Sequence, residues 1–318
     1  MKRYLLFASA VLTGLSLVFA QTLSNPFQSK LTAAETQPVT IRFQAQVGDR
    51  PFQCGESYSL GRPAKMMTPM DFRFYVSDIA LIDVNGKAVP LQLEQDGKWQ
   101  YKSVALLDFE NKSAACSNGT EDVRDRVVGT VAPGTYKGIR FSLGVPFALN
   151  HADATLATSP LNLTSLWWNW RGGYKFLRID LMDAGMSMSQ GTSEQSLSNH
   201  GAESAHGSAG HSSHAVQGFA IHLGSTACQA RMTTQPPTSC ANPNQAEIVL
   251  KNFNPAQNVV IVDLAALVAS TNLGMNQPST AAGCMSEPGD RDCLGIMASV
   301  GVSFGGQSPR GQTFFRVK

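Results

Sequence analysis

Three of the four tryptophans of the chain lie within the stretch SLWWNWRGGYKFLRIDLM. They are Trp167, Trp168 and Trp170. Tryptophan is large and carries a single N–H donor, so a protein that needs only apolar bulk can use leucine or phenylalanine without stranding a polar group. A strand that buries aromatic side chains is one interpretation of the cluster, and a chemical use of the indole rings is the other.

Four of the six histidines gather in residues 186–215, which read MSMSQGTSEQSLSNHGAESAHGSAGHSSHA. This Ser-, Gly- and Ala-rich composition without a hydrophobic period predicts a disordered insertion between two strands. The histidines indicate a low-affinity metal-gathering tract, with a loop in which they are incidental as the alternative. Chelation by a flexible tract costs chain entropy, so we do not expect the tightest site here. The four residues are His200, His206, His211 and His214.

The six cysteines fall into successive pairs along the chain. In an oxidising compartment an even number of cysteines predicts disulfides, and the short spacings favour pairing within the second and third pairs. Thiolate metal ligation is the alternative, but a CxxC pair, which would be its strong signal, is absent. The expected disulfides are Cys54–Cys116, Cys228–Cys240 and Cys284–Cys293.

The first twenty residues, MKRYLLFASAVLTGLSLVFA, have the organisation of a secretory signal peptide. Lys2 and Arg3 precede an apolar run, and small residues precede a cut after Ala20. A membrane anchor needs about 20 apolar residues and a stop-transfer flank, and no second such stretch follows. We therefore expect an exported, soluble mature chain, periplasmic or secreted, with no membrane span.

The charge and the motifs exclude several functional classes. The formal net charge is +2, and removal of Lys2 and Arg3 leaves a neutral mature chain, so we expect no nucleic-acid partner. The sequence contains no HExxH, GxSxG, Walker or GxGxxG motif. We therefore do not expect an enzyme.

Short alternating stretches separated by turn signals predict an all-β fold. The segment VTIRFQAQV at residues 39–47 alternates apolar and polar side chains, and DFRFYVSDIALIDV at 71–84 runs into Asn85-Gly86, a hairpin signature. Only DLAALVASTNLG at 263–274, capped by Asp263, is typical of a helix. We expect a disulfide-stapled β-sandwich with one short helix. The expected organisation is a signal peptide at 1–20, a flexible segment at 21–38 and one domain at 39–318 that contains the insertion at 186–215.

Four ordered motifs resemble the MbnP family, a group of methanobactin-associated periplasmic proteins also known as the four-Cys partners of a "metallo-mystery pair". FRFYVSDI and ALLDFEN fit the same family, so the resemblance extends from about residue 39 to the end. The His-rich insertion and the third cysteine pair depart from the family pattern. The four motifs are GVPFALNH (144–151), WWNWRGGYKFLRID (167–180), FAIHLGSTAC (219–228) and CMSEPGDRDC (284–293).

The resemblance implies a partner, a MauG-like di-haem enzyme of the cytochrome c peroxidase type, which oxidises a tryptophan to kynurenine. An intact indole is a poor metal ligand, whereas kynurenine presents an aniline nitrogen that can bind copper. Strand alternation places Trp168 and Trp170 on one face and Trp167 on the other, so we expect Trp168 or Trp170 to be the modified residue and a copper ligand. Cu(I) takes imidazole ligands, and the motifs offer His151 and His222.

Each histidine also has a plainer interpretation, because His151 could cap a turn and His222 could face solvent from a strand.

The resemblance as a whole implies a periplasmic copper-binding protein that holds Cu(I). The alternative is a secreted binding or delivery module with an unmodified aromatic platform and a His-rich metal-gathering loop. A purely structural secreted sandwich is the third possibility.

Overall fold

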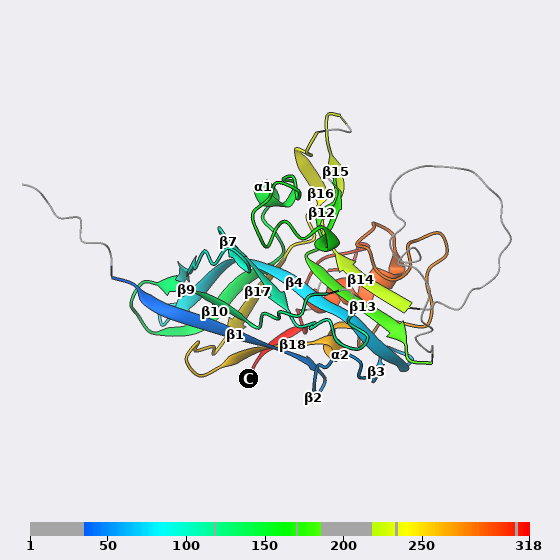
Figure 1. Cartoon of the computed structure of the whole chain (residues 1–318), viewed down its shortest axis with the longest axis horizontal. Coiled ribbons are helices and arrows are strands. Elements are labelled where there is room, and N and C mark those ends of the chain that lie inside the picture. Colours follow the sequence, from blue (N-terminus) through cyan, green and yellow to red (C-terminus); the bar gives the residue numbers. More distant parts are fainter. Residues whose placement is uncertain (1–34, 118, 170, 186–217, 233–234, 309–310) are drawn as a thin grey trace, which may run out of the picture. The chain divides into compact units, whose positions relative to one another are not determined.

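The computed structural model describes residues 35–117, 119–169, 171–185, 218–232, 235–308 and 311–318 (Figure 1). The expected signal peptide, the His-rich tract with its four histidines, and Trp170 lie outside the described residues. None of the helices in the described part is long and apolar enough to span a membrane.

Most strand residues of the described chain belong to two β-sheets, which confirms the all-β sandwich (Figure 1). The first sheet has the strand order β19-β18-β1-β9-β6, with β2 paired to β1. Its strands are β1 (Gln37–Val47), β2 (Arg50–Pro51), β6 (Gln92–Leu93), β9 (Arg126–Val131), β18 (Val259–Asp263) and β19 (Phe315–Val317). The flexible segment expected at 21–38 therefore ends two residues too late, because β1 already pairs with β9 from Gln37.

The second sheet has the order β14-β13-β4-β10-β17 and is built around β4, which also pairs with β3, β5 and β8. The Asn85-Gly86 turn joins β4 to β5 as an antiparallel hairpin, as the sequence predicts. The strands are β3 (Tyr58–Leu60), β4 (Lys65–Asp83), β5 (Ala88–Pro90), β7 (Gln100–Tyr101), β8 (Val104–Asp108), β10 (Tyr136–Leu143), β13 (Leu177–Asp183), β14 (Gly218–Leu223) and β17 (Ala246–Lys251).

Three short α-helices are present in the described residues, where the sequence predicts one. The predicted helix exists as α2 (Leu264–Leu267), with Asp263 Oδ1 accepting from the amides of Ala265 and Ala266 at 3.0 and 3.3 Å. It is shorter than expected because the chain turns after α2 to bury Val268 and Leu273 in the core. The other helices are α1 (Phe147–Asn150) and α3 (Leu294–Val300).

The main core lies between the two sheets, because alternate side chains of each strand point inward. In β17 the odd and even positions separate cleanly, with Ala246, Ile248 and Leu250 buried and their neighbours exposed. Phenylalanines from both sheets meet in the centre, for example Phe43 and Phe141 with ring centroids 5.9 Å apart. Edge-to-face packing of this kind adds to the area that the rings bury.

A second, smaller core covers the opposite face of β4 and β8. Tyr75 on β4 and Leu106 on β8 point away from the main core and pack beneath the chain that follows β10, including Leu166 and Tyr174. The two tyrosine rings lie 5.7 Å apart, and the Tyr75 hydroxyl donates to the Pro160 carbonyl at 3.0 Å. The second sheet is therefore buried on both faces in this region.

The buried outer face of the second sheet carries a ladder of charged side chains across four strands. In register from edge to interior lie His222 on β14, Arg178 on β13, Arg73 on β4 and Asp108 on β8. All four except Arg178 are at most 5 % exposed. Buried charges are tolerated only when paired, and the bridging carboxylates are those of Asp71, Asp180 and Glu110.

The three expected disulfides are present, Cys54–Cys116, Cys228–Cys240 and Cys284–Cys293. The first joins the loop after β2 to the loop after β8, and the third holds the segment before α3. The second joins directly opposed residues of β15 (Thr226–Gln229) and β16 (Ser239–Asn242), a separate two-stranded hairpin.

The protonation state of Asp108 in the folded protein provides a test of the ladder. Burial raises its pKa to about 8, with Arg73 opposing the shift and Glu110 and Asp71 adding to it. The folded protein therefore holds a proton on Asp108 that the unfolded chain has already released above its usual pKa near 4. As the pH rises from about 4 to about 8, the free energy of unfolding of the wild type should fall relative to that of Asp108→Asn, by on the order of 1 kcal/mol per pH unit. Urea titrations across this range measure the difference, and parallel pH curves for the two proteins would show that Asp108 does not carry the proton.

Candidate metal centre

His151 is the last residue of the motif GVPFALNH and directly follows α1. Pro146 starts the helix, which runs for only one turn, and His151 is its C-cap. The imidazole is 4 % exposed, and its centroid is 4.8 Å from that of the Phe147 ring. Nε2 of His151 lies 3.2 Å from Asn150 Nδ2 and 3.4 Å from Cys240 Sγ. His151 is thus a buried group that contacts both a side-chain amide and a disulfide.

Asn150 connects this histidine to two other segments. Its Oδ1 accepts from the Tyr174 amide at 2.8 Å, and its Nδ2 donates to Ser225 Oγ at 3.4 Å. Gly173 lies against it with φ +72°, and a Cβ there would be 2.5 Å from the Asn150 carbonyl oxygen. Only glycine fits that position, because the left-handed conformation and the close approach coincide.

Trp167 and Trp168 lie on β11 (Trp167–Asn169), which forms a small hairpin with β12 (Gly173–Tyr174) and is preceded by one 3₁₀ turn at Thr164–Leu166. The hairpin turn is fixed by Asn169 Oδ1, which accepts from the Arg171 and Gly172 amides at 2.9 Å each. Trp167 packs against the second core. Trp168 lies on the other side, over Gly224 and Gly172, so the predicted alternation of these two rings is present.

Gly224 gives the Trp168 ring its space. A Cβ on residue 224 would lie 2.5 Å from Trp168 Cζ3 and 2.7 Å from the Tyr174 carbonyl oxygen. The Gly224 amide donates to Ser286 Oγ at 3.1 Å, which holds this stretch of backbone to the segment after Cys284. Ser225, whose hydroxyl accepts a hydrogen bond from Asn150, directly follows residue 224. His222 lies two residues before it.

His222 is the end of the charge ladder. Its Nε2–H donates to Asp180 Oδ1 at 2.7 Å, and Asp180 Oδ2 accepts from Arg178 at 2.7 Å. Burial acts to raise the pKa of Asp180, but His222 and Arg178 hold it well below its usual range. Burial lowers the pKa of His222, which favours the neutral imidazole that metals require. The alternative interpretation, in which His222 faces solvent from its strand, is wrong, since its side chain is 7 % exposed.

The structure thus collects several predicted residues around the chain from 222 to 225. Trp168 lies over residue 224, which stands in the chain between His222 and Ser225, and Ser225 is linked through Asn150 to His151. Within the described residues, the group of His, Cys, Asp and Glu side chains close enough to hold a metal is His151 with Cys228 and Cys240. His222 is not in that group. Sequence reasoning did not foresee Asn150 or Asp180 as partners, nor that the Cys228–Cys240 bridge would lie against His151.

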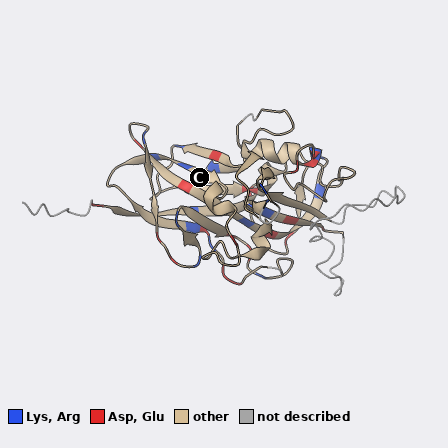
Figure 2. Ribbon diagram, turned by 90° about the horizontal axis from the view of Figure 1, so that it is seen from above, with Lys and Arg blue, Asp and Glu red and all other residues tan. Residues whose placement is uncertain are grey.

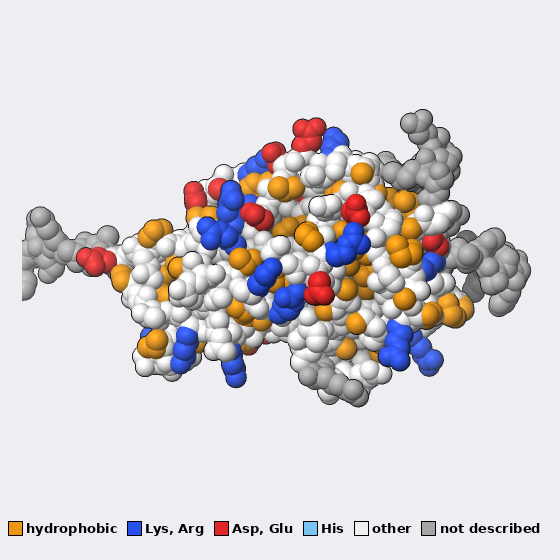
Figure 3. All heavy atoms as spheres, turned by 90° about the horizontal axis from the view of Figure 1, so that it is seen from below, with side chains coloured by type: hydrophobic (Ala, Val, Ile, Leu, Met, Phe, Trp, Pro, Cys, Tyr) orange, Lys and Arg blue, Asp and Glu red, His pale blue; other side chains and the backbone are white. Residues whose placement is uncertain are grey.

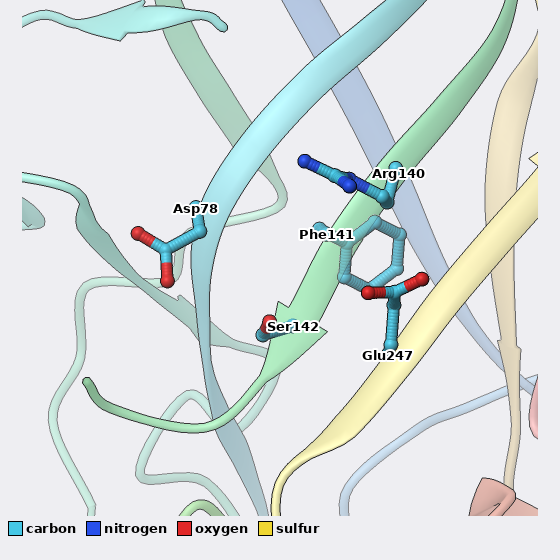
Figure 4. A pocket seen from close by; sticks show the side chains of 5 residues that line it. All are labelled: Asp78, Arg140, Phe141, Ser142 and Glu247. Carbon is cyan, nitrogen blue, oxygen red and sulfur yellow. The ribbon is translucent and has the colours of Figure 1, made fainter. Parts of the chain in front are cut away.

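A separate hollow of about 230 Å³ lies on the outer face of β10 and β17. Its lining includes Arg140 and Glu247, which Figure 4 shows on neighbouring strands, and Asp78, which points away from both. It contains none of the predicted site residues. Basic and acidic residues are interspersed along the ribbon of Figure 2 and on the face that Figure 3 shows.

Comparison with known proteins confirms the resemblance. The sequence model of the MbnP family matches residues 36–286. The chain belongs to the MbnP family. A solved structure, MbnP from Methylosinus trichosporium, is similar with a TM-score of 0.72 and 27 % identity, covering 89 % of this chain and 98 % of that one. Comparison with curated proteins gave no match.

The space over residue 224 can be tested with Gly224→Ala. The added methyl group must displace the Trp168 ring or the Tyr174 backbone, which should cost about 1–3 kcal/mol of the free energy of unfolding. Urea unfolding measures the loss, and near-ultraviolet circular dichroism should report the displaced indole. Gly134→Ala is the matched control, because its Cβ would meet only the Tyr136 hydroxyl at 3.5 Å. Equal stability and an unchanged tryptophan signal in Gly224→Ala would contradict this placement of the ring.

Proposed function

We propose that this MbnP-family chain is an exported copper-binding protein whose site is completed when a tryptophan is oxidised to kynurenine. The observation that supports this most directly is the packing of the Trp168 ring over Gly224, a residue that lies in the chain between His222 and Ser225, the hydrogen-bond partner of Asn150. The three disulfides favour an oxidising compartment such as the periplasm.

The oxidation converts the indole, whose N–H can only donate a hydrogen bond, into a group that can bind a metal ion. The C2–C3 bond of the indole breaks and two oxygen atoms are added, which gives N-formylkynurenine; hydrolysis then releases formate. Two equivalents of peroxide, reduced to water by a di-haem enzyme, balance the first step. The product retains an aniline nitrogen with a lone pair, which an intact indole lacks in its ring plane. The chain's own residues, Gly224 and Gly172 among them, supply the packing that holds this ring.

His222 has the surroundings of a metal-binding histidine. Its Nε2–H is bonded to Asp180, so Nδ1 is the nitrogen that would face a metal. Carboxylate–histidine pairs orient the imidazole and fix its tautomer in many metal sites. Arg178 in turn holds Asp180 ionised. We therefore propose His151, His222 and the oxidised tryptophan as ligands of Cu(I), a metal that accepts nitrogen ligands at low coordination number.

The proposed partner is a MauG-like di-haem enzyme. A residue oxidised by a large enzyme must lie near the surface or be connected to it through aromatic side chains. Trp168 is half-buried in a hairpin whose turn residues Asn169 and Arg171 are exposed. The exposed side chain of Phe147, 43 % accessible, contacts His151 from the α1 side. These features are compatible with docking of an enzyme over the tryptophan hairpin.

The second candidate function is a binding or delivery module with unmodified tryptophans. It shares the fold and the family and differs only in the chemistry of the rings. In that case copper binding would not depend on the partner enzyme.

Peptide mapping of protein produced with and without the partner separates the two. We expect one tryptophan in residues 166–171, Trp168 or Trp170, to lose one carbon and gain one oxygen, and we favour Trp168 because of its position over Gly224. Trp168→Phe should keep the fold and weaken copper binding, since a nitrogen ligand is removed. Trp99→Phe, which changes an indole of the second core's rim, is the matched control. Unmodified tryptophans in co-produced protein that still binds copper tightly would establish the second candidate.

The His-rich tract allows a separate test. Deletion of residues 191–214 should leave the fold and the tightest copper site intact and remove several weak sites, because His200, His206, His211 and His214 are proposed only as weak ligands. Copper titration followed by competition with a chelator measures both classes of site. Loss of tight binding in the deletion variant would instead make these histidines the main ligands.

A further inference from the structure

The Cys228–Cys240 disulfide and the His151 imidazole form a compact cluster of soft ligand atoms. The two sulfurs and a ring nitrogen all lie within 4.8 Å of one another, and Cys240 Sγ is 3.4 Å from His151 Nε2. In a three-coordinate, trigonal site with bonds of about 2.3 Å to sulfur and about 2.0 Å to nitrogen, these two ligand atoms stand about 3.7 Å apart. The sulfur–nitrogen spacing already fits a metal, and only the two sulfurs would have to separate.

The surroundings of this disulfide differ from those of the other two. Cys116, Cys284 and Cys293 are each 0 % exposed, so the other bridges have at least one sulfur fully enclosed. Cys228 and Cys240 are both half-buried on the β15–β16 hairpin. Thiol–disulfide exchange needs in-line access of a thiolate to a sulfur atom, so a reductant should open this bridge first.

The hairpin has other contacts that keep it in place. Backbone pairs flank the bridge on both sides, Thr226 with Asn242 and Gln229 with Ser239. At its base, Asn244 Nδ2 donates to the Gly224 carbonyl at 2.8 Å and Ser225 Oγ donates to the Pro243 carbonyl at 2.9 Å. Opening the bridge therefore leaves both sulfurs beside His151.

We propose that His151, Cys228 and Cys240 form a redox-gated site for Cu(I). With the bridge intact, neither sulfur is a thiolate and the site is closed. A dithiol reductant supplies two electrons; the S–S bond breaks, each sulfur takes up one proton, and the reductant leaves as its own disulfide. Cu(I) then displaces the two thiol protons and is held by two thiolates and the neutral imidazole.

Local charge favours the open form. Two thiolates and one Cu(I) carry a net charge of −1, which neighbouring cations stabilise. Arg231 follows Cys228 by three residues and lines, with Arg171 and Met232, a hollow of about 220 Å³ between the ends of the two hairpins. Both guanidinium groups belong to the segments that carry the tryptophans and the cysteines.

This site needs no oxidised tryptophan, so it can be tested apart from the proposed function. Mature protein is produced without a di-haem partner, treated with limited dithiothreitol under anaerobic conditions and desalted. Alkylation and peptide mapping should place the first thiols at Cys228 and Cys240. Competition with a chromophoric Cu(I) chelator should then show one more bound equivalent than in the untreated protein, with a copper–sulfur signal in X-ray absorption.

Variants of the cluster sharpen the result. Cys228→Ser/Cys240→Ser should bind no additional Cu(I) after reduction, and His151→Gln should weaken that binding by about tenfold or more, as loss of one ligand nitrogen implies. Cys54→Ser/Cys116→Ser is the matched control, since it removes another bridge and keeps the cluster. The proposal is overturned if the first thiols map to another pair, if opening the 228–240 bridge unfolds the protein by circular dichroism, or if reduction leaves Cu(I) uptake unchanged.

Discussion

The side-chain amide of Asn150 is the contact on which the candidate centre depends. Its oxygen accepts from the backbone of the tryptophan hairpin, and its nitrogen reaches Ser225 beside Gly224 and the imidazole of His151. One buried amide thereby fixes α1, β12 and the chain after β14 relative to one another. Since an unpaired buried amide is costly, these segments can only move together. The position of His151 follows from this arrangement, because it is the next residue in the chain.

The charge ladder positions the strands on which the same region is built. Arg73 and Arg178 lie on adjacent strands and would repel each other, and Asp71 lies between them, bonded to both. Without Asp71, Arg73 would lose its bidentate partner and Arg178 one of its two carboxylates, so the ladder favours a single register for β4, β13 and β14. That register places His222 at the sheet edge and sets where Gly224 meets Trp168. The metal centre and the fold are thus built from one continuous set of contacts.

Sequence patterns predicted the parts of the molecule that depend on neighbouring residues. The alternation of β1, the Asn85-Gly86 hairpin, the Asp263 cap and the two closely spaced cysteine pairs follow from local spacing, and Cys54–Cys116 is the pair that then remains. The charged residues of DFRFYVSD alternate with apolar ones, a pattern typical of a strand with one solvent-facing side, but Asp71 and Arg73 are buried because a second layer of chain covers that face. No local pattern shows such a layer. The 89-residue separation between His151 and Cys240 likewise concealed their contact, because His151 was predicted as a metal ligand and Cys240 only as half of a disulfide.

The parallel pairing of β1 with β18 also governs when this chain is able to fold. Arg42 lies opposite Val259, and β19, at the very end of the chain, completes the same sheet. β1, the first strand of the described chain to be synthesised, therefore cannot complete its sheet until β18 and β19 have been made. Folds dominated by such distant pairings form slowly, and their unpaired strands stay exposed in the meantime.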